Sequence, residues 1–201
     1  MASVLHPAAS RAGVAPRVAP AAYSACMPTP FAVLGIHCDA TGVTGVDYLD
    51  AGHPLAPPRS AIAARAVAEI ERYLADPDHR FGVALNPRGT PFQQRVWQAI
   101  LDIPSGQSRT YGELATRLVS APRAVGQACG SNPIALIIPC HRVTGSRGHL
   151  GGFMHSTQSD PLRIKRWLLA HERKFFDAPL FKRAATSMRQ QKELGSETNY
   201  R

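Results

Sequence analysis

Hydrophobic positions in the first half of the chain follow strand periodicity and then helix periodicity. Residues 31–37 and 42–49 each have the pattern of a short strand, and a polar turn separates them. Across residues 61–74 the apolar side chains recur every three or four positions, which predicts an amphipathic helix. Residues 81–85 alternate between apolar and polar, so they predict one more strand. Together these elements indicate a small α/β domain over residues 31–89.

The second half begins with strong helix-start signals. Thr90 is placed as an N-cap, Pro91 takes the first helical position, and Gln93 completes a capping box. A second capping box opens a short helix over residues 111–118, and a proline starts another helix over residues 122–130. Two short helices joined by a tight turn are typical of a helix-turn-helix.

The second of these short helices has two dissimilar faces. When it is projected at 100° per residue, its apolar face is a normal packing face. The opposite face carries Arg123, Gly126, Gln127 and Gly130. A surface this bare could lie close to a DNA backbone, although each glycine costs about 1 kcal/mol relative to alanine within a helix. A solvated face that contains glycines for no functional reason is the alternative, and spacing does not decide between the two.

Composition is that of an ordinary globular protein with a basic surplus. Hydrophobic residues make up 44% and charged residues 18% of the 201 positions, and no apolar run reaches the roughly 20 residues of a membrane-spanning helix. The net charge of +9 favours a polyanionic partner, nucleic acid before membrane. Residues 1–30 are rich in alanine and proline and are expected to form a disordered leader. Residues 90–175 would form the second domain, and residues 176–201 a polar tail.

The four cysteines contain no CxxC pair, which favours a reducing compartment and free thiols. Folding could bring His37, Cys38 and His79 together as zinc ligands, so a zinc site stays open at this point. A different cysteine stands in a more suggestive place. Cys140 follows an apolar run over residues 134–138, expected as a buried strand, and precedes His141.

A cysteine nucleophile needs a base or a positive charge nearby, because a free thiol is only a few per cent ionised at pH 7. Neighbouring residues of an extended segment point to opposite faces, so His141 is not expected to bond Cys140 directly. A bridging water or a bend in the chain would be required. Taken by itself, a Cys-His dipeptide is more often structural than catalytic.

The sequence around this cysteine resembles a known family. The string IPCHRV, preceded by Gly130-Ser131-Asn132-Pro133, is similar to the active-site signature of the O6-alkylguanine-DNA alkyltransferases. The likeness covers roughly 80 residues in collinear order. Its further parts are Thr90-Pro91-Phe92-Gln93, Val96-Trp97, Ile103-Pro104-Ser105-Gly106, Thr110-Tyr111-Gly112-Glu113-Leu114-Ala115, Arg123-Ala124-Val125-Gly126, Lys165-Arg166-Trp167-Leu168-Leu169 and Glu172.

The resemblance implies an activity and a set of catalytic roles. Such a protein moves an alkyl group from O6 of guanine, or O4 of thymine, onto its own cysteine, once per chain. Cys140 would be the acceptor, and His141 the base that reaches it through a water. Glu172 would orient that histidine, Asn132 would pack beside the active-site turn, and Tyr111 would assist departure of the guanine. No cofactor and no metal are implied.

The resemblance also implies how DNA is held. Arg123 would enter the duplex when the damaged nucleotide is flipped out, with its helix docked in the minor groove of double-stranded DNA. The DNA contact would further include Gly126, Gln127, Gly130 and Ser131. The pocket for the alkyl group would be lined by Phe153, Cys129 and Val143. The segment 154–161 is longer and more polar than usual for the family, and Phe153 replaces a frequent tyrosine, so the alkyl size preference is left open.

The expected fold is an α/β N-terminal domain of ribonuclease H-like type, followed by a mainly α winged-helix or helix-turn-helix domain. The expected protein is a monomer without membrane association, acting in the cytoplasm at the nucleoid, or in the nucleus of a eukaryote. Two alternative functions fit the sequence less well. An alkyltransferase-like protein that binds damage without accepting the group lacks the cysteine, whereas Cys140 is present. A small-molecule Cys-His-Glu hydrolase would have no use for Arg123 on a glycine-lined helix.

Overall fold

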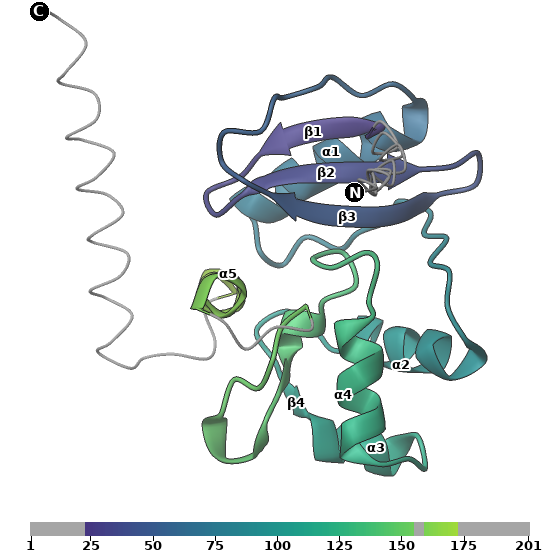
Figure 1. Cartoon of the computed structure of the whole chain (residues 1–201), viewed down its shortest axis with the longest axis vertical. Helices are drawn as coiled ribbons and strands as arrows, with labels where there is room; N and C mark the ends of the chain where they lie inside the picture. The colour runs from purple at the N-terminus through teal and green to yellow at the C-terminus, as the bar shows by residue number, and fades with distance from the viewer. Residues whose placement is uncertain (1–22, 155–158, 173–201) are drawn as a thin grey trace, which may run out of the picture.

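The structure, a computed structural model of the 201-residue chain, describes residues 23–154 and 159–172. The described part has two layers of elements, seen one above the other in Figure 1. A small sheet with one helix forms the N-terminal layer, and a group of helices forms the C-terminal layer. None of the described helices combines the length and the apolar character needed to cross a bilayer.

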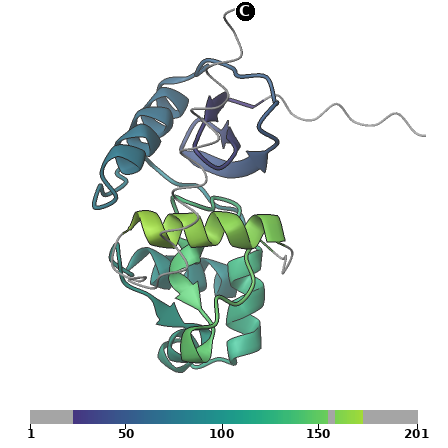
Figure 2. The ribbon, with the colours of Figure 1, turned by 90° about the vertical axis from the view of Figure 1, so that its left-hand side faces the viewer.

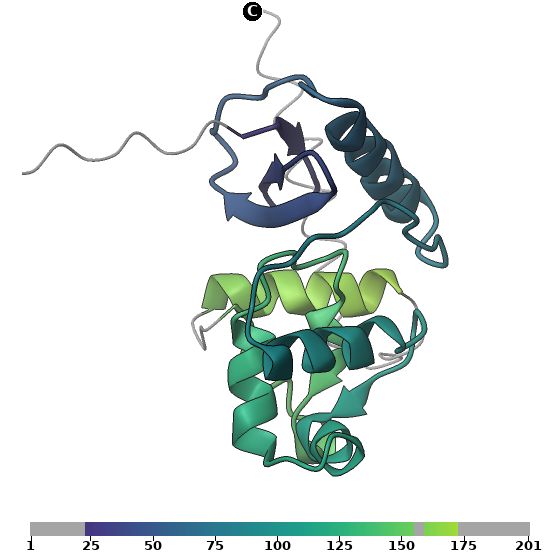
Figure 3. The ribbon, with the colours of Figure 1, turned by 90° about the vertical axis from the view of Figure 1, so that its right-hand side faces the viewer.

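The N-terminal layer is an antiparallel sheet covered by a helix. Its strands are β1 (Ala25–Pro28), β2 (Val33–Cys38) and β3 (Val43–Leu49), and they lie in the order β1-β2-β3. Helix α1 (Ala61–Ala75) packs against one face of the sheet, as Figures 2 and 3 show from opposite sides. Its N-cap is Ser60, whose hydroxyl accepts the N–H of the third helical residue at 3.1 Å.

Two expectations for this region were wrong. Strand β1 lies within the expected disordered leader, because four residues paired to β2 are too short a run for their alternation to stand out from the alanine- and proline-rich composition. Residues 1–22 of that leader lie outside the described residues. The expected strand at residues 81–85 is replaced by one isolated bridge between Val43 and Leu85. The N–H groups of Gly82 and Val83 bond the Glu69 carboxylate instead of a neighbouring strand.

The C-terminal layer confirms the predicted helix-turn-helix elements. Helix α2 covers Pro91–Leu101, α3 covers Tyr111–Arg117, and α4 covers Pro122–Gly130. Helix α5 (Ser159–His171) runs between these helices and the N-terminal layer (Figures 2 and 3). The pairs Thr90/Gln93 and Thr110/Glu113 both form complete capping boxes, as predicted.

One buried hydrogen bond joins two of these helices. The indole N–H of Trp97 in α2 donates to the carbonyl of Ala128 in α4 at 2.8 Å. Trp97 is almost completely buried, so this bond satisfies a donor that would otherwise be costly within the core. It also fixes α4, the helix expected to meet DNA, against the body of the domain.

The segment between α4 and α5 is less regular than expected. The apolar residues 134–138 are buried but form turns, with an isolated bridge between Ala135 and Ile138, rather than a strand. Leu136 has a φ of 83°, a left-handed conformation that interrupts extended pairing. The short 3-10 helix η1 (Cys140–Arg142) and strand β5 (Val143–Thr144) follow these residues.

Two short elements complete the segment. Strand β5 pairs in parallel with β4 (Arg109–Thr110), and the 3-10 turn η2 (Ser146–Gly148) follows. The β4–β5 pairing joins the start of α3 to the residues directly after Cys140. It therefore holds the helix-turn-helix in register with the turn that carries the thiol.

Glu69 in α1 provides a test of the N-terminal layer. Burial alone raises the pKa of its carboxyl, but hydrogen bonds from Arg65, Gly82 and Val83 outweigh that effect and hold the pKa below its ordinary value. A lowered native pKa stabilises the fold above the unfolded-state pKa, and this stabilisation is lost as pH falls through the native pKa. We expect Glu69→Gln to lower the free energy of unfolding by about 1–3 kcal/mol at pH 7.

The measurement is urea denaturation at pH 7 and at successively lower pH, with Glu71→Gln as the matched control. Glu71 is an exposed glutamate on the same helix. The difference between Glu69→Gln and the wild type should shrink as pH falls, and the control should stay within about 0.5 kcal/mol of the wild type. Equal stability of Glu69→Gln and the wild type at pH 7 would contradict the role given to this carboxylate.

Candidate functional site

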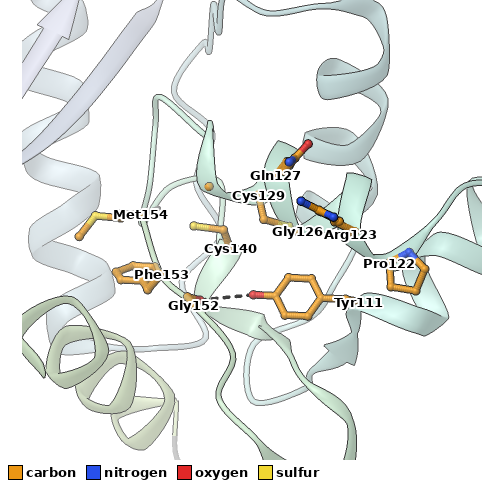
Figure 4. A pocket seen from close by; sticks show the side chains of 11 residues that line it. Tyr111, Pro122, Arg123, Gly126, Gln127, Cys129, Cys140, Gly152, Phe153 and Met154 are labelled. Atoms are coloured by element: carbon orange, nitrogen blue, oxygen red, sulfur yellow. Dashed lines mark hydrogen bonds between the residues drawn. The ribbon is translucent and has the colours of Figure 1, made fainter. Parts of the chain in front are cut away.

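A cavity of about 490 Å³ opens between the helix-turn-helix and the loop before α5. Cys140 lies in it, α4 forms one wall, and the loop around Gly152 forms another (Figure 4). The full lining is Tyr111, Pro122, Arg123, Gly126, Gln127, Cys129, Gly130, Cys140, Gly152, Phe153 and Met154. The cavity thus brings together residues that the sequence assigned separately to catalysis, to DNA contact and to the substrate pocket.

Cys140 begins the 3-10 turn η1 and is only 4% exposed. Its N–H donates to the Ile138 carbonyl, and the Asn132 amide donates to the same carbonyl at 2.8 Å. Burial raises the pKa of the Cys140 thiol, while a hydrogen bond from the Asn132 side chain and the charge of Lys165 act in the opposite direction. Asn132 therefore both supports the turn and contacts the thiol, beside the turn where the family resemblance placed it.

His141 points into the protein interior and is completely buried. Its Nε2 lies 2.8 Å from Oε1 of Glu172, so the pair predicted from the sequence is formed. Burial lowers the pKa of His141 and the Glu172 carboxylate opposes this, leaving the imidazole neutral and available as a base. Its Nδ1 is buried and has no hydrogen-bond partner among the described residues. The segment Cys140–Arg142 is a 3-10 turn, so the bend that the sequence analysis left open is present and the extended alternative is not.

Glu172 is the centre of a larger buried network that sequence reasoning missed. Its carboxylate accepts hydrogen bonds from His141, from the Tyr73 hydroxyl at 2.9 Å and from the Gly106 N–H at 3.1 Å. The guanidinium of Arg142 adds contacts to both carboxylate oxygens. Burial raises the pKa of Glu172, but these donors and the adjacent charges hold it well below its usual range. The only sequence signals were Arg142 and Gly106 within the family-like strings, since Tyr73 comes from the other layer.

Lys165 in α5 is a second residue whose role the sequence did not reveal. It is fully buried, and its ammonium donates to the carbonyls of Val143, Leu150 and Gly152. Burial lowers the pKa of Lys165 to about 8, opposed by the nearby thiols. The three carbonyls on one ammonium draw the cavity loop against α5. The residue was quoted only as part of a family-like string.

Tyr111 lines the cavity at the start of α3. Its hydroxyl donates to the Gly152 carbonyl at 3.3 Å, shown by the dashed line in Figure 4. Burial raises the pKa of Tyr111 well above its ordinary value, so the hydroxyl keeps its proton at neutral pH. Gly151 beneath the ring has a φ of 68°, and a Cβ there would lie 2.7 Å from the Tyr111 ring. Only glycine allows the loop to pass so close to Tyr111.

Helix α4 presents most of the predicted DNA-contact residues at the cavity. Arg123 and Gln127 are exposed, while Gly126 and Gly130 are partly buried, and all four line the cavity. Ser131 lies instead at the C-cap of α4, where its hydroxyl donates to the Gln127 carbonyl. At Gly126 a Cβ would be 3.8 Å from the Tyr111 ring, an ordinary contact. The glycine therefore keeps the cavity open and is not required by packing.

Two of the three predicted pocket residues line the cavity, and the third does not. Phe153 and Cys129 line the cavity beside the thiol. Val143 does not line it, because its side chain is fully buried in β5 and only its carbonyl faces Lys165, so this prediction was wrong. Met154, which no sequence argument selected, lines the cavity wall instead of Val143. Its backbone φ is 49°. The remainder of the long polar segment, residues 155–158, lies outside the described residues.

The three residues considered as zinc ligands do not gather in one place. Within residues 23–154 and 159–172 no group of three or more histidine, cysteine or carboxylate side chains is placed to hold a metal. His37 pairs with Asp47 at 3.0 Å, and His79 packs edge-on against Phe81. The open zinc hypothesis therefore has no support from this geometry.

Comparisons with known proteins point to one family. Residues 91–174 match a family model described as 6-O-methylguanine DNA methyltransferase, DNA binding domain. A methylated-DNA–protein-cysteine methyltransferase of Methanosarcina acetivorans is 37% identical over 157 residues, covering 75% of this chain and 97% of the relative. The protein of the same name from Mycobacterium bovis is 52% identical over 90 residues, or 44% of this chain. This chain therefore covers only about half of that relative's length, namely 54%.

Solved structures agree with these relatives. Mycobacterium tuberculosis OGT in complex with DNA is 38% identical with a TM-score of 0.62, covering 73% of this chain and 90% of that one. Mycobacterium tuberculosis O6-methylguanine methyltransferase is 36% identical with a TM-score of 0.64, covering 78% and 95%. The similarity therefore extends over both layers of the fold and includes the turn that carries Cys140. This chain belongs to the family of the methylated-DNA–protein-cysteine methyltransferases, the O6-alkylguanine-DNA alkyltransferases.

Proposed function

We propose that this protein repairs DNA by transferring a methyl or other alkyl group from O6 of guanine to Cys140. One observation carries the proposal. The thiol lies within a cavity that opens beside the exposed Arg123 of a helix-turn-helix, while the His141–Glu172 pair is buried behind it. Such an arrangement suits a base that is extruded from a duplex and presented to a nucleophile.

The reaction is a displacement at the alkyl carbon. Cys140 loses its proton toward His141, whose imidazolium form would be stabilised by Glu172. The thiolate attacks the alkyl carbon, a carbon–sulfur bond forms, and the bond to O6 breaks with its electrons leaving on guanine. Tyr111, protonated at neutral pH, donates a proton to the departing base. The thioether is stable, so each chain would react once and without a cofactor.

DNA access would follow from charge and shape. The net charge of +9 favours binding to a duplex, and a contact mainly with the backbone carries little sequence specificity. The exposed face of α4, with Arg123 and Gln127, would enter the minor groove. Arg123 would occupy the gap left by the flipped nucleotide and so offset part of the few kcal/mol that flipping costs. Activity on O4-alkylthymine is part of the same proposal.

We also propose a more detailed fold for each of the two domains. We infer a ribonuclease H-like sheet domain over residues 31–89, extended at its start by β1, and a winged-helix domain over residues 90–175. The α3–α4 pair and the β4–β5 pairing support the second assignment. We propose a monomer in the cytoplasm at the nucleoid, or in the nucleus of a eukaryote. A damage-binding protein without transfer is not favoured, since Cys140 is present in the cavity.

Replacing the nucleophile tests the chemistry. Cys140→Ser should bind DNA containing O6-methylguanine but transfer no methyl group, because a hydroxyl is far less acidic and less nucleophilic than a thiol. The wild type should gain one methyl group per chain, on Cys140, as measured by intact mass and peptide mapping. Cys129→Ser is the matched control, since Cys129 lines the same cavity. Product in large excess over protein, or methylation of another residue, would overturn the single-turnover mechanism.

The buried pair predicts a pH effect. His141→Gln removes the base, so the pKa of Cys140 should rise and the transfer rate at pH 7 should fall about 10²-fold or more. The rate should recover as pH increases, because hydroxide then forms the thiolate. The measurement is a pH–rate profile, with His171→Gln as the control. His171 bonds the Tyr73 carbonyl and not Glu172. A profile with the wild-type midpoint would argue against His141 as the base.

Arg123 should act on base extrusion and not on chemistry. In Arg123→Ala, repair of duplex DNA should slow by tenfold or more, with a smaller loss on free O6-benzylguanine. Arg117, at the end of α3, pairs with Asp102 and does not line the cavity, so Arg117→Ala is the control variant. The readout is the ratio of the two rates. Equal losses on duplex and free base would show that Arg123 serves another step.

A further inference from the structure

Four buried side-chain polar atoms have no hydrogen-bond partner among the described residues, and two of them belong to side chains packed around the candidate nucleophile. One is Nδ1 of His141, and the other is the hydroxyl oxygen of Tyr48. Tyr48 comes from β3 in the N-terminal layer, which the sequence did not connect with the chemistry. Buried polar atoms are rarely left unpaired, and a small polar cavity commonly holds a water that bonds them.

The position of Tyr48 follows from how β3 is attached to the active-site segment. The N–H of Val46 donates to the Pro133 carbonyl at 2.8 Å, next to Asn132. Two residues further along the strand, Tyr48 points to the same side of the sheet as Val46. Its ring meets Phe153, a wall of the cavity, edge-on at 6.1 Å between centroids. The strand thus brings a phenol against Phe153, a residue of the cavity wall.

Electrostatic coupling supports this placement. Burial raises the pKa of Tyr48 well above its ordinary value, and the proximity of Cys140 raises it further. Tyr48 in turn contributes to the raised pKa of Tyr73, whose hydroxyl bonds the carboxylate that holds His141. Tyr48 thus packs against Phe153 at the cavity that holds Cys140, and its hydroxyl is buried without a partner among the described residues, as is Nδ1 of His141. Tyr48 stays protonated at neutral pH and offers one O–H donor.

We propose that Tyr48 is a positioning residue for thiol activation, its hydroxyl donating to a water that also bonds His141 Nδ1 and Cys140. This inference rests on the proposed function. The proton balance is simple. The thiol gives its proton to the water, and the water gives one of its own protons to Nδ1 of His141. The Tyr48 hydroxyl occupies one lone pair of the water, so the other lone pair can accept the thiol proton while one water proton points at Nδ1 of His141. Loss of this donor would leave the thiolate–imidazolium state less stable.

Other polar and titratable groups also face the thiol, and they are the same in the wild type and in Tyr48→Phe. They are Lys165 from α5, Cys129 from α4, Tyr111 from α3 and Asn132 from the turn after α4. The imidazole is flanked by Glu172, Arg142 and Lys165. Tyr48→Phe leaves each of these in place and retains the ring against Phe153. The variant therefore isolates the hydroxyl.

The test measures the pKa of Cys140 directly. Iodoacetamide labelling of Cys140, quantified by peptide mapping across pH, should show a midpoint about 0.5–1 pH unit higher in Tyr48→Phe than in the wild type. Methyl transfer from O6-methylguanine DNA should be three- to tenfold slower at pH 7 and should reach the wild-type plateau at high pH. Tyr23→Phe is the matched control, because Tyr23 belongs to the same layer and packs on His37 and His53.

Each outcome either supports or overturns the role proposed for Tyr48. A wild-type labelling midpoint in Tyr48→Phe, or a lower plateau with an unchanged midpoint, would mean that Tyr48 only packs. Should the variant not fold, a high-resolution crystal structure of the wild type decides. Density for one water within hydrogen-bond distance of Tyr48 Oη and His141 Nδ1 supports the proposal, and its absence overturns it. A wild type that repairs no DNA would overturn the proposed function, while the labelling midpoints would still test Tyr48.

Discussion

The buried carboxylate of Glu172 is the constraint on which the rest of the site depends. At 2% exposure it would be strongly unfavourable without partners, and it accepts hydrogen bonds from His141, Arg142, Tyr73 and Gly106. These donors come from three separate parts of the chain, and Glu172 itself comes from a fourth. Removing one of them leaves a buried charge undersatisfied, so the ends of α5 and α1, the loop after α2 and the turn η1 are held together. The orientation of the imidazole behind Cys140 is a consequence.

The two layers have complementary tasks around the cavity. The helices of the C-terminal layer supply the face proposed to meet DNA, with an exposed arginine and a cavity kept open by Gly126. Within the described residues the N-terminal layer contributes none to the cavity lining, yet it supplies Tyr73 to the carboxylate and places Tyr48 against Phe153. The N-terminal layer thus meets the candidate site through two phenols, Tyr73 at Glu172 and Tyr48 at Phe153. Its contribution is to the environment of the thiol rather than to recognition.

The errors of the sequence-based predictions share one physical cause. Residues 81–85 and 134–138 both have strand-like apolar patterns, but their N–H groups find partners other than a neighbouring strand. Apolar periodicity reports which side chains are buried and does not report where backbone hydrogen bonds go. Val143 was misplaced for a related reason, since nothing local distinguishes a cavity wall from the core of β5. The capping boxes were predicted correctly because each is complete within four residues.

The sequence by itself determined the helix starts and the α3–α4 helix pair, and it selected Cys140, His141 and Glu172 as candidate site residues, since these depend on local hydrogen bonds or on residues in a family-like string. Tertiary structure alone decided that Glu172 accepts hydrogen bonds from both layers, that Lys165 bonds three carbonyls, and that Tyr48 packs against Phe153 at the cavity. Tyr48 and Cys140 are 92 positions apart in the chain. Their proximity follows from the docking of β3 on Pro133, a backbone contact that no side-chain pattern encodes.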